Sequence, residues 1–290
     1  MPDPLRSRLS PRQLGLLDAW LPGAQVVRDH SWGLTSTVVL EVAVDDRTYA
    51  VKAAAPDDHH LVHELRAHAQ WLEPWTSVGA GPILRFGDES ARILVTEWVP
   101  GSLVQGSGAE GETETYRQAG ALLARMHGQS AVEDPGHEGR ETARMLAWLD
   151  RPHGIPGDQV ERVRAEVERW PDDVAVLVPT HGDWQPRNWV VDDGTVRVID
   201  LGRADLRPAY TDWARLAVQQ FVGRPDLERA FVEGYGSDPR EPRAWRRQLL
   251  REAVSTAAWA HQVGDEGFEA QGLRMLVAAL QHDDSTQEVS

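Results

Sequence analysis

Two short stretches decide how this sequence is interpreted: HGDWQPRN at residues 181–188 and VIDLGRAD at residues 198–205. A short apolar segment at residues 174–178 precedes the first stretch, and another at residues 196–199 leads into the second. Apolar runs of this length, bounded by polar residues, are typical of short buried strands. We therefore expect two strands that each end at a loop of polar side chains.

These loops carry three oxygen-bearing side chains in a defined order. Asp183 is followed five residues later by Asn188, and Asp200 directly follows the second apolar segment. In phosphoryl transfer a carboxylate accepts the proton of the attacking hydroxyl, while an amide oxygen and a second carboxylate hold Mg²⁺. The order and the types of these residues therefore indicate a kinase.

The chain has a single lysine, Lys52, among its 30 basic residues. This lysine lies in a predicted strand, residues 47–53, and precedes Glu64, which lies on the next predicted helix. Arginine cannot easily replace a lysine that places a compact ammonium against a phosphate. We therefore expect Lys52 to contact nucleotide phosphates and Glu64 to orient it.

Local patterns place these residues in an α+β chain. Ser10 to Gln13 is a capping box that starts a helix reaching about Trp20. Residues 38–44 alternate between apolar and other side chains and form a predicted hairpin with residues 47–53. Further predicted elements are a helix from about residue 57, strands at 83–84 and 93–95, helices at 116–127 and 159–170, and mainly helices after 211.

The two stretches resemble signatures of one family, the aminoglycoside phosphotransferase and choline kinase superfamily. HGDWQPRN is similar to its HGDxxxxN motif, and VIDLGRAD to its metal-binding segment. TEWVPGSL at residues 96–103 resembles its interlobe hinge, LARMH at 123–127 one of its helix ends, and Asp212-Trp213-Ala214 a motif further along. The resemblance covers about residues 25–220.

This resemblance implies a protein-kinase-like fold of two lobes with ATP and Mg²⁺ between them. Residues 1–98 would form a β-rich nucleotide-binding lobe, and residues 99–290 a mainly helical lobe for catalysis and acceptor binding. The implied roles are Asp183 as catalytic base, Asn188 and Asp200 as magnesium ligands, Lys52 with Glu64 at the α- and β-phosphates, Ser31, Gly33, Thr35 and Ser36 in a phosphate-covering loop, and the backbone of Glu97 and Val99 at the adenine.

The sequence departs from the family pattern in two places. The phosphate-covering loop has one glycine, so backbone amides and hydroxyls would have to bind the phosphates. The path from Asp200 to Asp212 lacks the family's glycine-aspartate-proline, which leaves the role of Asp205 open. Arg187 stands where the family often has glycine, and it could pair with a carboxylate or reach the transferred phosphate.

Several side chains near the motifs have plainer interpretations. We expect His181 to be a structural hydrogen-bonding residue, and Trp184 and Trp189 to pack in the core or to line the acceptor site. The histidines at positions 59, 60, 63 and 68 do not have the spacing of HExxH, so we expect solvated polar residues there. Residues 106–111 match GxGxxG, but no strand precedes them and acidic residues follow.

Composition narrows the class of protein and of partner. The net charge of −15 disfavours a nucleic-acid partner, because such a surface repels phosphates. The absence of cysteine excludes disulfides and thiolate metal sites. No segment approaches the ~18 continuous apolar residues that a membrane-spanning helix needs. No secretory signal is visible at the N-terminus, so a cytoplasmic location is expected. No motif indicates an obligatory protein partner. The sequence also gives no motif for the oligomeric state or for a preference between ATP and GTP.

The charge is unevenly distributed between the two predicted lobes. Residues 1–98 carry nine basic and thirteen acidic residues, whereas residues 99–290 carry twenty-one and thirty-two. An acidic cleft raises the local concentration of a cation. We therefore expect a cationic acceptor that bears a hydroxyl, such as an aminoglycoside or a basic peptide antibiotic, with candidate contacts at Asp265, Glu266 and Glu269.

Other functions remain open at this point. The acceptor could be choline-like, a sugar amine or an amino acid. A protein kinase would need a long activation segment, which the thirteen residues from Asp200 to Asp212 do not provide. A catalytically dead nucleotide-binding module is disfavoured because the predicted base, metal ligands and lysine are all present.

Overall fold

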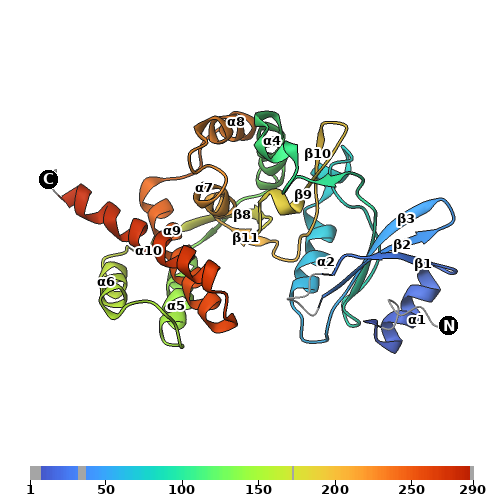
Figure 1. The fold of residues 1–290 in the computed structure, drawn as a ribbon, viewed down its shortest axis with the longest axis horizontal. Helices are drawn as coiled ribbons and strands as arrows, with labels where there is room; N and C mark the ends of the chain where they lie inside the picture. Colours follow the sequence, from blue (N-terminus) through green and yellow to red (C-terminus); the bar gives the residue numbers. More distant parts are fainter. Residues whose placement is uncertain (1–7, 32–36, 172, 288–290) are drawn as a thin grey trace. The chain divides into compact units, whose positions relative to one another are not determined.

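The computed structural model describes residues 8–31, 37–171 and 173–287. The chain divides into two compact units. Unit 1 contains the described parts of residues 1–129, 179–206 and 223–237, and unit 2 contains those of residues 130–178, 207–222 and 238–290. Figure 1 shows how the elements are arranged within each unit.

A five-stranded antiparallel sheet dominates the first part of unit 1. Its strand order is β1-β2-β3-β5-β4, and every residue of β2 from Val38 to Val44 pairs with β3. The hairpin turns at Asp45, which adopts a positive φ of 52° that aspartate tolerates. The strands are β1 (Gln25–Asp29), β2 (Val38–Val44), β3 (Arg47–Ala53), β4 (Leu84–Asp88) and β5 (Ile93–Glu97).

The first helix, α1 (Pro11–Trp20), has the predicted capping box at Ser10 and Gln13. The Gln13 side chain also donates to the carbonyl oxygens of Ala54 at 3.0 Å and Ala91 at 2.8 Å. Because Leu17 of this helix belongs to the same buried cluster as the inward side chains of β2 and β3, α1 closes one face of the sheet. The sequence prediction for this helix is confirmed.

Helix α2 (His60–Gln70) starts just after Asp58, whose carboxylate accepts a hydrogen bond from the backbone of Leu61 at 3.0 Å. Its buried side chains include Glu64, which is only 3% exposed. A short helix, α3 (Glu73–Thr76), follows. Its Trp75 is fully buried and donates to the carbonyl oxygen of Leu122 at 2.7 Å.

Two helices of unit 1 approach each other closely: α4 (Thr113–His127) and α8 (Pro225–Tyr235). Gly120 on α4 makes this possible, because a Cβ there would lie 2.3 Å from the carbonyl oxygen of Phe231. A Cβ on Gly234 would lie 1.9 Å from the carbonyl oxygen of Arg117. Residues 223–237 thus return to the first unit, which no local pattern predicts.

The two motif stretches flank the hairpin of a small sheet in unit 1. Its order is β10-β9-β6, and β9 (Trp189–Asp192) pairs with β10 (Thr195–Val198) as a hairpin. The 3₁₀ turn η3 (Pro186–Asn188) directly precedes β9. Asn188 and Asp200 therefore flank this hairpin, one before it and one after it. The remaining short elements of the unit are β6 (Ser102–Leu103) and η2 (Gly108–Gly111).

Unit 2 is mainly helical, as predicted for the later part of the chain. Its longest helices, α9 and α10, pack along each other, and α5 packs against α9. Inside it, the buried Glu138 carboxylate lies 2.9 Å from Arg251 and 3.3 Å from Arg247. The helical elements are α5 (His137–Leu149), α6 (Gly157–Val167), η4 (Ala209–Trp213), α7 (Ala214–Val218), α9 (Pro242–Val263) and α10 (Glu266–Gln287).

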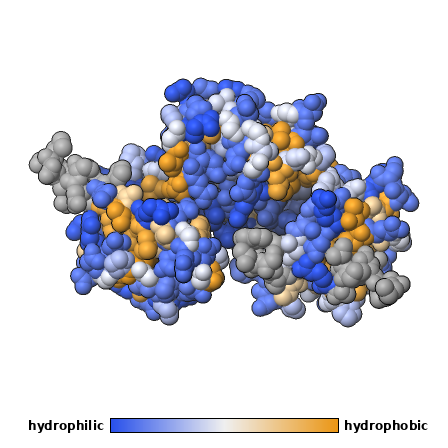
Figure 2. Space-filling view, in the orientation of Figure 1, coloured by the Kyte–Doolittle hydropathy of each residue, from blue (hydrophilic) through white to orange (hydrophobic). Residues whose placement is uncertain are grey.

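Three short strands complete the described chain. β7 (Val132–Asp134) pairs with the first half of β8 (Ala175–Thr180), and β11 (Asp205–Arg207) follows the second motif stretch. The chain passes from one unit to the other within β8 and within β11. Among the described helices, none is long and apolar enough to cross a membrane. Hydrophilic residues cover most of the face shown in Figure 2.

Candidate active site

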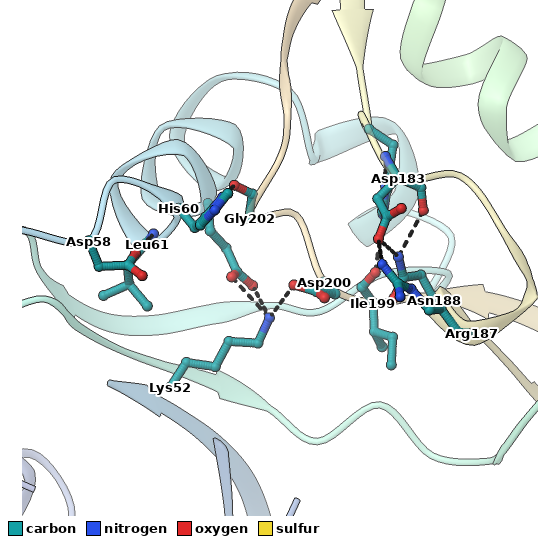
Figure 3. A network of polar contacts seen from close by, with 12 residues as sticks. Lys52, Asp58, His60, Leu61, Asp183, Arg187, Asn188, Ile199, Asp200 and Gly202 are labelled. Atoms are coloured by element: carbon teal, nitrogen blue, oxygen red, sulfur yellow. Dashed lines mark hydrogen bonds and ion pairs between the residues drawn. The ribbon is translucent and has the colours of Figure 1, made fainter. Parts of the chain in front are cut away.

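Lys52 lies one residue before the C-terminal end of β3, opposite Leu94 of β5. Its ammonium contacts both carboxylate oxygens of Glu64, at 2.8 and 2.9 Å, and Oδ1 of Asp200 at 2.9 Å (Figure 3). The structure therefore brings together the lysine and the glutamate that the sequence paired. It also brings Asp200 to them, although 148 residues separate Asp200 from Lys52.

The three charges of this cluster depend on one another. Burial disfavours the charged form of Lys52, but the carboxylates of Asp200 and Glu64 outweigh it and raise the pKa of Lys52 above its usual range. The ammonium in turn holds the pKa of Asp200 far below its usual range. Burial raises the pKa of Glu64, whereas Asp200 stays ionised and about half of its side chain is exposed. With both carboxylates ionised, the cluster carries one more negative than positive charge. This surplus favours a cation beside Asp200.

The backbone of Asp200 is left-handed, with a φ of 66°. Residues other than glycine rarely adopt this conformation, although aspartate does so more readily than most. Such a conformation persists where the surrounding structure holds it, and it is common at functional sites. It sets the direction in which the Asp200 carboxylate leaves the chain after β10.

Asp183 lies in a tight loop after Gly182, which has a φ of 78°. Its Oδ1 accepts a hydrogen bond from Gln185 at 2.5 Å, and its Oδ2 accepts one from Arg187 at 2.6 Å and one from Asn188 at 2.9 Å. The amide nitrogen of Asn188 also donates to the Asp183 carbonyl at 2.8 Å. Because both bonds use the nitrogen of Asn188, its amide oxygen is the atom available as a metal ligand.

His181 connects the two motif stretches. Its Nε2 lies 3.1 Å from the carbonyl oxygen of Ile199, and Ile199 donates its backbone N–H to the carbonyl of Asn188 at 2.9 Å. His181 is fully buried. These contacts match the structural role that the sequence analysis predicted, since they fix the residue before Asp200 relative to the Asp183 loop.

Trp184 and Trp189 are core residues and do not line an acceptor site. Their side chains are 1% and 0% exposed. Trp184 packs between Trp75 and Trp189, with ring centroids 5.7 and 5.6 Å away. These three rings support the Asp183 loop from inside unit 1. Of the two interpretations that the sequence left open, packing is therefore the correct one.

The predicted nucleotide contacts are only partly within the described chain. Gly33, Thr35 and Ser36 lie outside the described residues. The hydroxyl of Ser31 accepts the backbone N–H of Val39 at 2.9 Å, which ties the start of the predicted loop to β2. The N–H of Glu97 donates to Ile83 at 2.9 Å, so Glu97 would offer adenine its carbonyl oxygen rather than its N–H.

Three comparisons with known proteins bear on this arrangement. The model of the phosphotransferase enzyme family matches residues 26–247. This chain belongs to that family. An aminoglycoside 3'-phosphotransferase of Streptomyces fradiae is 31% identical over 212 residues, which cover 64% of this chain and 78% of that enzyme. Another, of Streptomyces ribosidificus, is 30% identical over 174 residues, covering 53% and 65% of the two chains.

Solved structures show that the fold of this phosphotransferase is protein-kinase-like. A choline kinase of Streptococcus pneumoniae superposes with a TM-score of 0.68 at 15% identity, covering 92% of this chain and 97% of that one. An aminoglycoside phosphotransferase with bound ADP and hygromycin B gives 0.66 at 14% identity, covering 94% and 98%. The predicted fold class is confirmed: an antiparallel sheet comes first, and a mainly helical region follows.

Three contacts in the two motif stretches could not be predicted from the motifs alone. Gln185 binds the predicted base and was not singled out, although it stands two residues after Asp183 in a loop that turns sharply. Arg187, for which the motif left open a pairing with a carboxylate or a contact with the transferred phosphate, pairs with Asp183 in this structure. Asp205, whose role the sequence left open, pairs with Arg66 at 2.8 Å.

His59 is exposed, as expected for a solvated histidine, but His60 and His63 make contacts that the helical spacing did not predict. His60 and His63 are not simply solvated: each reaches a backbone carbonyl of the segment after Asp200. No cluster of three potential metal ligands is found in the described part of the chain, so these histidines do not form a metal site there. The helical spacing showed that they share an end of α2, but it could not show which segment that end contacts.

Proposed function

We propose that this phosphotransferase transfers the γ-phosphate of ATP, with Mg²⁺, to a hydroxyl of a cationic small molecule. The observation that carries the proposal is the pair of clusters in unit 1: Lys52 with Glu64 and Asp200, and Asp183 with Asn188. A kinase site needs a cation for the phosphates, oxygen ligands for Mg²⁺ and a carboxylate for the acceptor proton. The two clusters supply all three.

In the proposed reaction, the acceptor hydroxyl oxygen attacks the γ-phosphorus while the bond to the β–γ bridging oxygen breaks. ADP leaves, and the hydroxyl proton passes to Asp183. Lys52 would contact the α- and β-phosphates, and Asn188 and Asp200 would hold Mg²⁺, which would supply positive charge for the phosphate oxygens. Transfer is direct, without a phosphoenzyme. Residues 1–98 serve the nucleotide, and residues 99–290 supply the catalytic loop and the acceptor site.

The acceptor class is supported by charge and by relatives. Residues 99–290 have an excess of eleven acidic over basic residues, which favours a cation. The relatives at 31% and 30% identity are aminoglycoside 3'-phosphotransferases. We therefore propose an aminoglycoside or a basic peptide antibiotic as the first class to examine. Choline-like compounds, sugar amines and amino acids form the second.

An ADP-release screen over a panel of hydroxylated amines tests this function. The panel contains aminoglycosides, basic peptides, choline, amino sugars and hydroxyamino acids, each with Mg·ATP. Asp183→Asn serves as the matched control, since it retains the shape of the side chain. Acceptor-dependent ADP release by the wild type, absent from the variant, supports the proposal. Phosphorylation of the hydroxyamino acids alone, which carry no net charge, contradicts the cationic acceptor.

A further inference from the structure

One face of α2 holds the segment that follows Asp200. Nδ1 of His60 lies 2.9 Å from the carbonyl oxygen of Gly202, and Nδ1 of His63 lies 3.0 Å from the carbonyl oxygen of Ala204. A carbonyl oxygen can only accept a hydrogen bond, so the contact with Gly202 requires that Nδ1 of His60 carries a proton and donates it. Nδ1 of His63 also lies 3.3 Å from Nη2 of Arg66, and Arg66 donates to the same Ala204 carbonyl oxygen at 3.3 Å. His63 and Arg66 therefore contact Ala204 together. Figure 3 shows the contact between His60 and Gly202 beside the Lys52 cluster.

The contacts continue along the same helix. Arg66 donates to Oδ1 of Asp205 at 2.8 Å. Residues 60, 63 and 66 are spaced by three, so their side chains lie on neighbouring turns of one helix face. This face therefore contacts residues 202, 204 and 205 in turn.

The other side of the same segment is also fixed. The hydroxyl of Thr180 donates to the carbonyl oxygen of Asp205 at 2.7 Å, at the far end of the segment. His181 contacts Ile199, the residue before Asp200. Asp200 therefore sits between two anchored points. His60 and His63, like Arg66 and Thr180, contact this segment and have no part in the proposed chemistry.

We propose that His60 and His63 are positioning residues that hold residues 201–205 against α2 and so keep the Asp200 carboxylate in place for Mg²⁺. This inference rests on the proposed function, because it assigns Asp200 to the metal. The left-handed backbone of Asp200 is a conformation that must be held by its surroundings. The two imidazoles supply that restraint from the helix that also carries Glu64.

The test uses leucine and asparagine at the two histidines. His60→Leu/His63→Leu keeps apolar bulk and removes both polar contacts, whereas asparagine keeps an N–H close to the position of Nδ1. His59→Leu is the matched control: His59 stands at the same end of α2 and contacts the rings of His60 and His63, without a hydrogen bond to the 201–205 segment. Arg66 is left unchanged because it also stacks on Trp71.

Two measurements are made on each variant. Amide hydrogen exchange over residues 200–206 reports whether the segment is held, independently of activity. The dependence of turnover on free Mg²⁺ reports the position of Asp200. The double leucine variant should exchange at least about tenfold faster in this segment and need about tenfold more Mg²⁺ for half-maximal turnover, with an unchanged acceptor KM. The asparagine and His59→Leu variants should behave like the wild type.

Wild-type exchange and an unchanged Mg²⁺ requirement in the double leucine variant overturn the inference. If that variant does not fold, each single leucine variant carries the same test with the same two readouts. Failure of the proposed function looks different: Asp183→Asn would then retain turnover while the exchange of residues 200–206 still responded to the histidine substitutions. The exchange measurement needs no substrate, so it separates the two outcomes.

Discussion

The carboxylate of Asp183 is surrounded by donors from its own loop. Gln185, Arg187 and Asn188 each bind one of its oxygens at 2.5 to 2.9 Å, and the side chain is 4% exposed. If Asp183 is the base, as proposed, these hydrogen bonds orient its carboxylate before the acceptor binds, which lowers the part of the activation barrier that comes from orienting the reacting groups. The motif revealed Asp183 and Asn188, but only the folded loop shows that residues two and four positions after the base also contact it.

Arg187→Met should therefore lower kcat by about tenfold or more while changing the KM for Mg·ATP little, because misplacement of a catalytic group is costly and the nucleotide contacts lie elsewhere. Arg187→Lys should recover part of kcat, since an ammonium can still pair with Asp183 but lacks the planar fork. Steady-state kinetics at saturating acceptor measures both. An Arg187→Met enzyme with wild-type kcat contradicts a role in orienting the base.

Lys52 offers a second test at the scale of one residue. An amine attacks acylating reagents only when it is deprotonated, and the carboxylates beside Lys52 raise its pKa above that of an ordinary lysine. At pH 8, acetylation of the folded protein should reach the α-amino group long before Lys52, whereas in urea Lys52 should react at the ordinary rate. Mass spectrometry resolves the two sites because no other lysine is present. Equal reactivity of Lys52 in the two states contradicts the charged cluster.

Helix α2 carries Glu64, and its His60 and His63 also contact the segment after Asp200. Its sequence pattern predicted the first of these features and not the second. The helical spacing predicted the helix and placed Glu64 beside its apolar stripe, and the structure has that helix at His60–Gln70. The face that carries His60 and His63 was expected in solvent, because periodicity identifies a face without identifying its neighbour. The neighbour is a segment about 140 residues later in the chain. Contacts of that range cannot be inferred from a local period.

His68, on α2, makes the stability of the protein sensitive to acid. Burial, with Lys52 adding to it, lowers the pKa of His68 to about 4, and its Nε2 is buried without a hydrogen-bond partner. The unfolded chain therefore binds this proton first, near pH 6.5. Stability is unaffected above that pH and should fall between pH 6.5 and 4, by up to about 3 kcal/mol from this residue.

The pH dependence of urea unfolding measures this effect, with His68→Gln as the comparison. The variant should lose less stability than the wild type between pH 6.5 and 4.5, because glutamine does not titrate. His59→Gln, at an exposed position of the same region, should leave the slope unchanged. Parallel stability profiles for the wild type and His68→Gln contradict the assignment.

At the scale of the whole molecule, the sequence predicted the fold class and the order of its parts well. The capped first helix, the β2–β3 hairpin and the helical later region follow local rules of capping, alternation and turns. The return of residues 223–237 to unit 1 does not follow such local rules, because it depends on the close approach of α4 and α8 that Gly120 and Gly234 permit. A glycine inside a predicted helix is the only local sign of such an approach.

The net negative charge of the whole chain gives a prediction about how the acceptor binds. If an acidic surface attracts a cationic acceptor, salt should screen the attraction, with a Debye length of ~8 Å at physiological strength. The acceptor KM should rise several-fold between about 20 and 300 mM salt, and the KM for Mg·ATP should rise less. Initial-rate kinetics at both ionic strengths measures the two constants. A salt-independent acceptor KM would favour a neutral sugar or an amino acid.

The candidate acidic contacts need conservative variants in this experiment. Asp265 accepts the backbone N–H of Phe268 at 3.0 Å at the start of α10, and Glu269 contacts His261 at 2.9 Å. Charge reversal at either position would disturb these contacts as well as the charge. Asp265→Asn, Glu266→Gln and Glu269→Gln remove charge and keep an acceptor oxygen. Together they should weaken acceptor binding more than Mg·ATP binding.

The identity of the base is the central claim, and one comparison tests it most directly: kcat and Mg·ATP affinity in Asp183→Asn. An amide cannot accept the hydroxyl proton, whereas the proposed nucleotide contacts at Lys52, Asn188 and Asp200 remain. We predict that kcat falls about 100-fold or more, that the Kd for Mg·ATP by calorimetry stays within about threefold of wild type, and that thermal melting shows a folded protein. A folded variant that keeps a tenth or more of the wild-type kcat would contradict the account.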